Sequence, residues 1–480
     1  MKWGNRMSKK VALVTLQPVD VRSAGAVNLG YYAVKETFIK EGWEVDEYTC
    51  KEWYIPNPYE YDIIAFSVYY YTQLINLLPF LKRNHIPYRR TDRRPTILVG
   101  GQGCQNNLLN DYIDIVSMGA CETSLPFILE NHRDLELLST HPNVFVPSID
   151  KDINTKELGY YDKVDSPVVI YGKNAVVQIS HGCRYRCKFC GYSWSVGKYK
   201  EKPIEVVKEQ LLEAKSKGVT GVNLFSADMT GYSHIIELLD FMIEHDIRIL
   251  NTDIRASGYT EEIAERLDKL KFRRASIGVE SFDESVRQGI NKKLTDQQLE
   301  ECIDRAMRHN VSTLHLYLIA GLPNEQYNHW IEWFEKIKAR VEEEERSIRV
   351  DFSIQNFQPM QYTPLKDFSF VDFDEKHKFV RKFLQCKYEL GWLSRPAEEK
   401  DYCNLGGKIG MKECSYLVTM FVLHGDSTGG NVLEELDMKT FVGRSINPKL
   451  YSKIRAVCER HPEWYQIKKV DNPEKGVWED

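Results

Sequence analysis

The sequence lacks any long apolar segment. Among its 480 residues, one of the most apolar stretches is LHLYLIAGL at 314–322, which is far shorter than the roughly 20 residues that a membrane-spanning helix needs. Residues 1–16 carry basic side chains but no continuous apolar core of the kind found in secretory signals. We therefore expect a protein without a membrane span that resides in the cytoplasm.

A large excess of charge of either sign is also missing. Lys and Arg number 64 against 69 Asp and Glu, which leaves a formal net charge of −5. This balance argues against a chain drawn to nucleic acid or anionic lipid by bulk charge, and the sequence contains no recognised module that binds DNA or RNA. With 42% hydrophobic and 28% charged residues, the composition is that of a globular protein, and the length predicts about three domains.

Cysteine is too sparse and too scattered for a disulfide framework, and its count of 11 is odd, so we expect reduced thiols. One group stands apart: HGCRYRCKFCGYSW contains Cys183, Cys187 and Cys190 with the spacing C-x3-C-x2-C. Residues 174–180 before this group read as a buried strand, and residues 202–218 after it read as a helix. The three thiols are therefore predicted on a loop that joins a strand to a helix.

Three neighbouring thiolates suit a [4Fe–4S] cluster. Such a cluster is normally bound by four cysteine thiolates, so three thiolates leave one iron open to an outside ligand. The same difference between closed and open coordination separates structural from catalytic zinc sites. Two alternatives stay open: a zinc site that recruits a fourth ligand such as His181, and three cysteines that bind no metal.

The cysteine motif, with Phe189 before its third cysteine, resembles the signature of the radical S-adenosylmethionine (SAM) superfamily. The resemblance extends over residues 174–366 and implies an α/β fold with a central partial (β/α)6 barrel, in which functional groups lie at the carboxyl ends of parallel strands. The blocks that carry it are GVTGVNLFSADMTG (218–231), IRILNTDIRAS (247–257), RASIGVESFDESVRQGINKK (274–293), VSTLHLYLIAGLPNE (311–325) and DFSIQNFQPMQYTPL (351–365).

The resemblance implies that SAM binds the open iron, and that an electron from the reduced cluster cleaves SAM to a 5′-deoxyadenosyl radical. Arg255 would then bind the SAM carboxylate, because a guanidinium donates to both carboxylate oxygens, and Glu280 would accept the SAM amine. The plainer alternative is that Arg255 and Glu280 pair with each other. Two interpretations apply to Lys292 and Lys293: they reach this site, or, as we favour, they lie on the surface.

Further candidates for SAM binding lie at two strand ends. By the same resemblance, Ser226 and Asp228 would bind the ribose hydroxyls, whereas Phe189 and Tyr192 would line the adenine. The alternatives are that Ser226 and Asp228 cap a helix or form a turn, and that the two aromatic residues only pack.

The N-terminal third predicts a second α/β domain, a Rossmann-like doubly wound sheet whose ligands would bind beyond the carboxyl ends of its strands. A glycine-rich turn, VGGQG, follows one of these strands and lets the backbone approach a ligand closely. The predicted strands lie at 9–18, 61–71, 94–103 and 112–119, and the predicted helices at 26–42 and 121–131.

This segment resembles the cobalamin-binding domain that precedes the barrel in many radical SAM enzymes, through the turns LVGGQG and SMGACETS in residues 9–135. The resemblance implies a cobalamin site at Ser67, Gly100, Gly101 and Gly119. Arg22 stands where the histidine of a D-x-H-x-x-G motif would lie, and arginine cannot ligate cobalt. The alternative is a scaffold domain without a cofactor.

We predict three domains: residues 1–150 of the cobalamin-binding type, residues 151–368 as the radical SAM barrel, and residues 369–480 as a mostly helical cap that contributes to the substrate pocket. The spacing of the cysteines in the last segment matches no iron–sulfur pattern, so structural thiols are expected at Cys386, Cys403, Cys414 and Cys458.

The resemblance therefore predicts a radical SAM enzyme with a [4Fe–4S] cluster, SAM and cobalamin as cofactors. The favoured reaction is cobalamin-dependent methylation of an unactivated carbon. The alternatives are a radical rearrangement, oxidation or thiolation without cobalamin, and a non-catalytic iron–sulfur protein that senses redox state. Expected partners are a small-molecule or peptide substrate and an external electron donor of the flavodoxin or ferredoxin type, with nucleic acid not indicated.

Overall fold

The computed structural model describes residues 9–16, 29–48, 54–90, 95–104, 106–156, 164, 166–250, 252–344, 348–360, 362–368, 425 and 448–461. The chain forms two compact units. The N-terminal unit consists of Met1–Asp162, Trp194–Gly197 and Cys414–Gln466, and the barrel unit of Lys163–Ser193, Lys198–Glu413 and Ile467–Asp480. Most of the predicted cap at 369–480, including Cys386, Cys403 and Cys414, lies outside the described residues, and so does Arg22.

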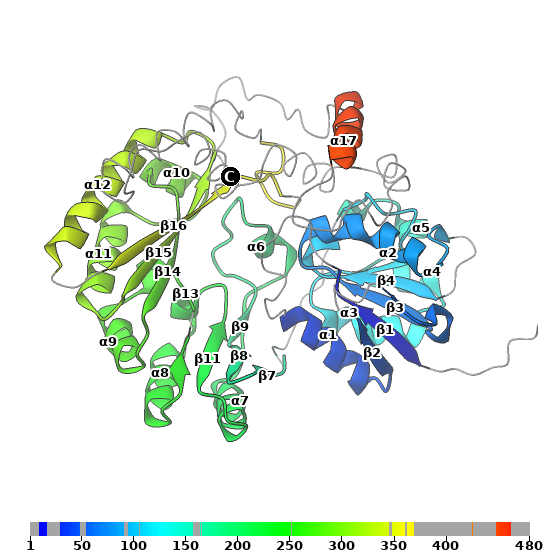
Figure 1. The fold of residues 1–480 in the computed structure, drawn as a ribbon, viewed down its shortest axis with the longest axis horizontal. Coiled ribbons are helices and arrows are strands. Elements are labelled where there is room, and N and C mark those ends of the chain that lie inside the picture. The colour runs from blue at the N-terminus through cyan, green and yellow to red at the C-terminus, as the bar shows by residue number, and fades with distance from the viewer. Residues whose placement is uncertain are drawn as a thin grey trace, which may run out of the picture. The chain divides into compact units, whose positions relative to one another are not determined.

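The N-terminal unit contains a six-stranded sheet in the order β2-β1-β3-β4-β5-β6 (Figure 1). The first five strands are parallel, and β6 runs antiparallel to β5. This strand order is that of flavodoxin-like doubly wound sheets, which confirms the predicted Rossmann-like class. The strands are β1 (Lys10–Val14), β2 (Glu44–Tyr48), β3 (Ile63–Ser67), β4 (Thr96–Gly100), β5 (Ile115–Ser117) and β6 (Val144–Phe145).

Helices complete this unit because continuous apolar strands such as β3, all five of whose residues are buried, need cover on both faces. Phe38 of α1 and Ile128 of α3 belong to one buried cluster with strand residues Val11 and Ile63. The helices are α1 (Leu29–Lys40), α2 (Leu77–Arg83), α3 (Cys121–Asn131), α4 (Leu135–Ser139), α5 (Pro147–Asp150) and α17 (Pro448–Arg460), with 3-10 turns η1 (Pro58–Glu60), η2 (Tyr71–Asn76), η4 (Gln102–Cys104) and η5 (Ile153–Thr155).

The barrel unit contains six successive parallel strand positions, as predicted. The third position is split: β12 pairs with β11, and β13 pairs with β14, so two four-stranded sheets meet there, in the orders β12-β11-β8-β7 and β13-β14-β15-β16. The strands are β7 (Val169–Tyr171), β8 (Asn174–Gln178), β11 (Gly221–Phe225), β12 (Arg248–Ile249), β13 (Asp253–Ile254), β14 (Arg274–Glu280), β15 (Thr313–Ala320) and β16 (Arg349–Asn356), and β9 (Ser180–His181) pairs with β10 (Lys200–Glu201).

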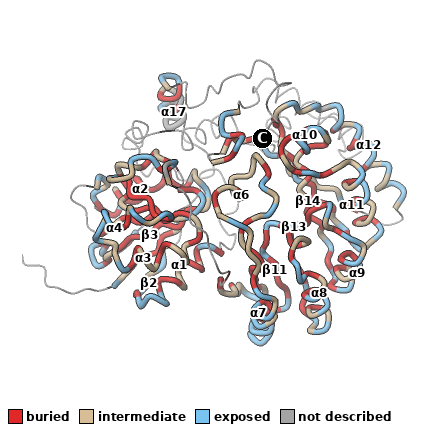
Figure 2. The backbone as a smooth tube through the Cα atoms, turned by 180° about the vertical axis from the view of Figure 1, so that it is seen from behind, coloured by how far each residue is buried: buried red, intermediate tan, exposed pale blue. Residues whose placement is uncertain are grey.

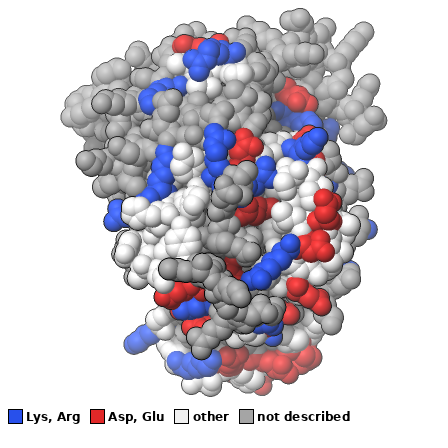
Figure 3. All heavy atoms as spheres, turned by 90° about the vertical axis from the view of Figure 1, so that its right-hand side faces the viewer, with Lys and Arg blue, Asp and Glu red and all other residues white. Residues whose placement is uncertain are grey.

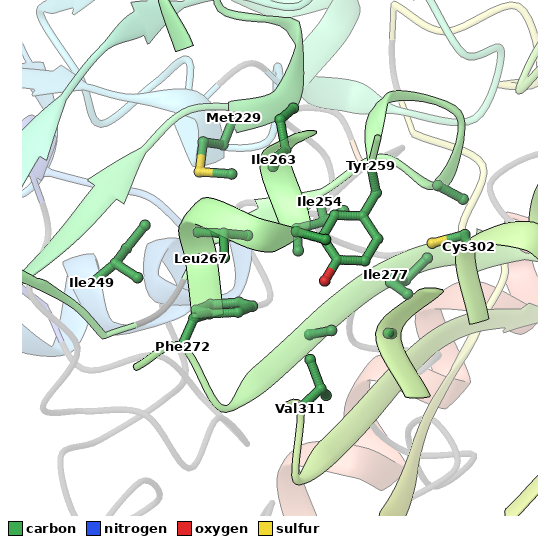
Figure 4. Close-up of a cluster of buried hydrophobic side chains, with 14 of the residues drawn as sticks. Met229, Ile249, Ile254, Tyr259, Ile263, Leu267, Phe272, Ile277, Cys302 and Val311 are labelled. Atoms are coloured by element: carbon green, nitrogen blue, oxygen red, sulfur yellow. The ribbon is translucent and has the colours of Figure 1, made fainter. Parts of the chain in front are cut away.

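Between successive strand positions of the barrel, helices return the chain to the start of the next parallel strand, as parallel pairing requires. Side chains of α9, such as Ile263 and Leu267, pack on Ile277 of β14 in a continuous buried cluster (Figure 4), and Figure 2 shows buried residues along β14. The helices are α6 (Gly191–Ser195), α7 (Ile204–Ser216), α8 (Ile235–Glu244), α9 (Glu261–Lys269), α10 (Glu284–Gly289), α11 (Asp296–Arg308) and α12 (Tyr327–Glu343), with turns η6 (Met229–Gly231) and η7 (Ala256–Gly258).

Within the described part of the chain, no helix is both long and apolar enough to span a membrane. Figure 3 shows Lys and Arg side chains beside Asp and Glu side chains on one face of the molecule. Lys10, for example, forms an ion pair of 3.0 Å with Asp46. Cys104, Cys302 and Cys458 are buried free thiols.

Candidate functional site

The three motif cysteines lie in the loop between β9 and α6. Cys187 is buried, whereas Cys183 and Cys190 are partly exposed, and all three are free thiols. The loop turns tightly, because the Cys190 amide donates to the Cys187 carbonyl at 3.1 Å. Gly182, just before the first cysteine, has a φ of +71°, and a Cβ there would lie 2.8 Å from the Lys198 carbonyl oxygen. This loop therefore requires glycine at that position.

A second segment holds the cysteine loop in place. The Asn291 side-chain amide donates to the carbonyls of Tyr185 at 2.9 Å and Arg186 at 3.1 Å. The Lys188 amide donates to the Ile290 carbonyl at 2.9 Å. The turn after α10 thus holds the backbone between the first and third cysteines through hydrogen bonds to backbone groups of the loop. No sequence motif indicates these contacts.

The electrostatic surroundings of Cys187 bring the cysteine motif together with the predicted SAM residues. Burial raises the pKa of Cys187 to about 11, and the negative charges of Glu280 and Cys190 act in the same direction, whereas the cations Lys292 and Arg255 oppose them. Positive groups beside a thiolate favour its charged form. Cys187, Glu280, Lys292 and Arg255 therefore share one site.

The grouping of possible metal ligands bears on the zinc alternative. In the part of the chain that the structure describes, no three His, Cys, Asp or Glu side chains converge closely enough to hold one ion. A tetrahedral zinc site needs such convergence, whereas the thiolates of a [4Fe–4S] cluster bind different irons. The zinc alternative with His181 therefore gains no support among these residues.

Glu280, which is partly buried, and Lys292, which is buried, form an ion pair of 2.8 Å at the carboxyl end of β14. Glu280 has a φ of +69°, and the pairing of β14 with β15 shifts register between Gly278 and Glu280. A Cβ at Gly278 would lie 2.8 Å from Glu280 Oε1 and 3.0 Å from Lys292 Nζ. Backbone strain of about 1–3 kcal/mol of this kind concentrates at functional sites.

Lys292 corrects an expectation, because it is only 9% exposed rather than on the surface. Burial acts to lower its pKa, but the charges of Glu280 and Cys187 outweigh burial, so the pKa of Lys292 is raised and the amine stays protonated. This burial could not be predicted from the sequence, because paired lysines normally lie in a solvated turn. The expected alternative that Arg255 pairs with Glu280 is wrong, since Lys292 holds that carboxylate.

Arg255 instead contacts three other groups. Its guanidinium carbon lies 3.7 Å from the centre of the Tyr185 ring, Nε donates to Ser257 Oγ at 3.1 Å, and the guanidinium also donates to the Lys292 carbonyl. Tyr185, a residue of the cysteine loop that we did not single out from the sequence, thus joins the motif to the third strand position.

Asp228 and Ser226 lie at the carboxyl end of β11 in a network of hydrogen bonds. Asp228 accepts from the Tyr185 hydroxyl at 2.7 Å, and it caps η6 by accepting from the Thr230 amide at 3.0 Å. Ser226 Oγ accepts from the Asp228 amide at 3.0 Å and from Ser180 Oγ at 3.0 Å. Both residues therefore form the local turn, as the alternative supposed, and Asp228 also contacts the cysteine loop.

The two aromatic candidates differ in their surroundings. Phe189 packs against a buried apolar cluster that includes Val286, Leu322 and Phe357. The Tyr192 hydroxyl accepts from the Gly182 amide at 3.2 Å. Burial raises the pKa of Tyr192 to about 12, and the neighbouring Cys183 and Cys190 act in the same direction. Tyr192 therefore lies beside the thiols, whereas the contacts of Phe189 are those of a packing residue.

In the N-terminal unit, the four cobalamin candidates Ser67, Gly100, Gly101 and Gly119 follow the strand ends of β3, β4 and β5 along one edge of the sheet. Gly101 has a φ of +110°, and a Cβ there would lie 2.2 Å from the Val68 carbonyl oxygen. The protein's own backbone therefore fills the space beside Gly101, whereas we predicted that a ligand would lie close to the backbone of this turn.

Comparison with known proteins agrees with this arrangement. The radical SAM superfamily model matches residues 177–337, and the model for the N-terminal part of radical SAM proteins matches residues 56–147. An uncharacterized protein of Methanocaldococcus jannaschii is 23% identical over 336 residues, which cover 68% of this chain and 73% of the relative. The ribosomal protein uS12 methylthiotransferase RimO of Hydrogenobaculum sp. is 25% identical over 286 residues, 55% of this chain and 69% of the relative.

Solved structures share the fold at low identity. The radical SAM methyltransferase TsrM from Kitasatospora setae, with cobalamin and a [4Fe–4S] cluster bound, aligns with a TM-score of 0.56 and 15% identity over 75% of this chain and 77% of that chain. The cobalamin-dependent enzyme OxsB, with aqua-cobalamin and SAM bound, aligns with a TM-score of 0.54 and 14% identity over 95% of this chain and 80% of that chain. Both family models match in the expected order, so the chain contains a radical SAM domain preceded by the N-terminal domain of radical SAM proteins.

Proposed function

We propose that Cys183, Cys187 and Cys190 hold the [4Fe–4S] cluster that a radical SAM domain implies, and that SAM binds its remaining iron. When bound, the cluster supplies the electron that cleaves SAM reductively to a 5′-deoxyadenosyl radical. The chain itself binds, orients and shields the cofactor. The observation that carries this proposal is the placement of Cys187 beside Arg255, Glu280 and Lys292, because it joins the thiols to groups that suit a zwitterionic amino acid.

Glu280 is suited to receive the SAM amine. Its Oε1 accepts from Lys292, and within the described residues no hydrogen bond occupies its Oε2. A protonated amine at Oε2 would leave the carboxylate between two cations, which favours the ionised form. The strained backbone of Glu280 fixes the direction of this side chain.

Arg255 and Asp228 are suited to opposite ends of the same ligand. Arg255 is held by Tyr185 and Ser257, so its fork is oriented before a carboxylate arrives, which reduces the entropy cost of binding. Asp228, with Ser226 beside it, offers oxygen acceptors for ribose hydroxyls, and Tyr192 or Phe189 would contact the adenine.

For the overall reaction, we propose cobalamin-dependent methylation of an unactivated carbon in a small-molecule or peptide substrate, with electrons from a flavodoxin- or ferredoxin-type donor. The support is the flavodoxin-like strand order of the N-terminal unit, since such sheets bind ligands beyond their carboxyl edge, together with a fold shared with TsrM and OxsB. Cobalamin would lie against the edge formed by Ser67, Gly100 and Gly119.

A titration tests the cobalamin step. Anaerobic holoenzyme is mixed with hydroxocobalamin, and the visible spectrum and co-elution on gel filtration are recorded. We expect a spectral change and retention of about one cobalamin per chain. The matched control is Cys187→Ala, which disables the cluster site but leaves the N-terminal unit intact, so it should retain cobalamin equally. No spectral change and no retention by either protein would refute the cobalamin proposal and leave the radical SAM assignment standing.

A second candidate is radical thiolation, favoured by one observation: several curated relatives are methylthiotransferases, including RimO of Hydrogenobaculum sp.. Insertion of sulfur needs a sulfur donor in addition to the cluster that binds SAM. An iron content well above the roughly four per chain of one cubane, combined with no cobalamin binding, would favour thiolation over methylation.

A further inference from the structure

The barrel sheet has one face that its helices do not cover, here called the inner face. On β15, Leu314, Leu316 and Leu318 belong to the buried cluster under the helices, so Tyr317 between them points to the inner face. The same alternation places Phe225 on this face, next to the buried Leu224. The strands β13, β14 and β15 that carry part of this face are neighbours (Figure 1).

Two aromatic side chains on the inner face are open to solvent. Tyr317 is 37% exposed and Phe225 is 43% exposed, although inward-pointing side chains of closed barrels normally pack together. The Tyr317 ring is held in place by stacking on His315, at 4.5 Å between ring centres, and His315 Nε2 contacts Ser353 Oγ at 2.7 Å. A rigid, accessible aromatic surface of this kind is typical of a ligand site.

Asp253 lies on the same face, since its neighbour Ile254 belongs to the buried cluster. The strand pairing places Asp253 opposite Ser276 of β14, and Ser276 opposite His315 of β15. Burial and the negative charge of Asp253 raise the pKa of Tyr317, whereas the cation Arg274 acts in the opposite direction, so the Asp253 carboxylate lies near that phenol. Asp253 and Tyr317 therefore border one region.

Asp253 differs from the other carboxylates of the inner face in having no hydrogen bond or ion pair within the described residues. Asp228 accepts from Tyr185, Glu280 holds Lys292, and Asp351 pairs with Arg349 at 2.7 Å. Asp253 is exposed, and partial desolvation and the nearby Asp228 raise the pKa of its carboxyl, whereas Lys292, with which it forms no ion pair among the described residues, acts to lower it. A carboxylate in this position gains most from a cation supplied by a ligand.

We infer that Asp253 is the residue that recognises the substrate, and that the substrate carries a protonated amine beside an apolar or aromatic portion, which rests on Tyr317. The amine would form an ion pair with Asp253 and a cation–π contact with the phenol ring. This inference rests on the proposed function, because it assigns the substrate class of that same site.

The test uses two probes that differ only in charge, 2-phenylethylamine and 2-phenylethanol. Their affinities are measured by saturation-transfer NMR with anaerobic, SAM-loaded, unreduced holoenzyme. The variants are Asp253→Asn and, as matched control, Asp240→Asn, whose carboxylate lies on the outer helix α8 and pairs with Arg266 at 2.8 Å. We expect the amine to bind the wild type and the control about tenfold more tightly than the alcohol, which is the effect of one favourable ion pair of about 1.4 kcal/mol, and the Asp253→Asn variant to lose this preference.

Equal affinities for the two probes in the wild type, no binding of the amine, or an unchanged preference in Asp253→Asn would each overturn the inference. The alternative that Asp253 binds the amine of SAM is tested by equilibrium dialysis with SAM. A large loss of SAM affinity in Asp253→Asn would assign the carboxylate to SAM and overturn the inference. Formation of 5′-deoxyadenosine by reduced wild-type enzyme is measured separately. Its absence would refute the proposed function, whereas the probe preference depends only on Asp253.

Discussion

Glu325 provides a quantitative prediction about pH and stability. Its Oε1 accepts hydrogen bonds from Ser281 Oγ at 2.5 Å and Trp330 Nε1 at 2.7 Å, whereas Oε2 has no partner among the described residues. Burial raises the pKa of Glu325 from an ordinary value of 4.5 to about 8, and Asp283 acts in the same direction. The folded protein therefore keeps this carboxyl neutral at pH 7.

The sign of the effect follows from proton linkage. Below the unfolded-state pKa the carboxyl is neutral in both states, so its favourable contribution is fully present. As the pH rises from 4.5 to about 8, only the folded state holds the proton, and stability falls. At about 1.4 kcal/mol per pH unit, the loss is at most about 5 kcal/mol, and it levels off above the folded-state pKa.

The substitution Glu325→Gln removes this titration and keeps the shape of the side chain. At pH 5 we expect the variant and the wild type to differ by less than about 1 kcal/mol, the scale of one hydrogen bond. At pH 9 the variant should be more stable by roughly 3–5 kcal/mol, observed as a higher melting temperature of the holoenzyme. Glu335→Gln, at an exposed residue of α12, the helix that follows Glu325, is the control and should show no such divergence. If the melting temperatures of Glu325→Gln and the wild type run parallel from pH 5 to pH 9, the reasoning is wrong.

Three further predictions concern the site and its support. Lys292→Met leaves the partly buried Glu280 without its cation, so stability should fall by up to about 3 kcal/mol in chemical denaturation. Lys292→Arg should recover part of the loss, and equal stabilities of wild type and Lys292→Met would contradict the ion pair. Asn291→Ala removes two hydrogen bonds to the cysteine loop, so iron retained after gel filtration should drop, and full retention would show that the loop needs no clamp. Gly101→Ala places a Cβ 2.2 Å from a carbonyl oxygen at a φ that alanine disfavours. The variant should be destabilised by more than about 2 kcal/mol, so its melting temperature should drop by several degrees. Gly42→Ala, whose Cβ would have nothing within 4 Å at a φ of +77°, should lower the melting temperature less.

The class of fold was predictable because its signals are local. The patterns that predict apolar strands and amphipathic helices each lie within a short stretch of consecutive residues. For example, the structure places α3 at Cys121–Asn131, as expected. The splitting of the third barrel strand into β12 and β13 was not visible, because each half pairs with a different neighbour. Strand pairing between distant segments leaves little trace in one sequence.

The site was predictable only where a motif marks it. The cysteine spacing drew attention to the thiols, and the resemblance to radical SAM enzymes pointed to Arg255, Asp228 and Glu280. Lys292, Asn291 and Tyr185 were missed because their importance comes from a turn after α10 that packs on the cysteine loop more than 100 positions earlier in the chain. Asp253 was missed because an acidic residue two positions before Arg255 reads as an ordinary polar residue until the faces of the sheet are known.

The central claim is that three thiolates hold a cluster whose fourth iron binds SAM. The most direct measurement is formation of 5′-deoxyadenosine after anaerobic reconstitution with iron and sulfide, addition of SAM and reduction with dithionite, in the wild type and in Cys187→Ala. We predict that the wild type forms 5′-deoxyadenosine and that the variant, left with two of the three thiolates, forms none. SAM cleavage by Cys187→Ala at the wild-type level, or no cleavage by a wild-type protein that contains the full cluster, would contradict the claim.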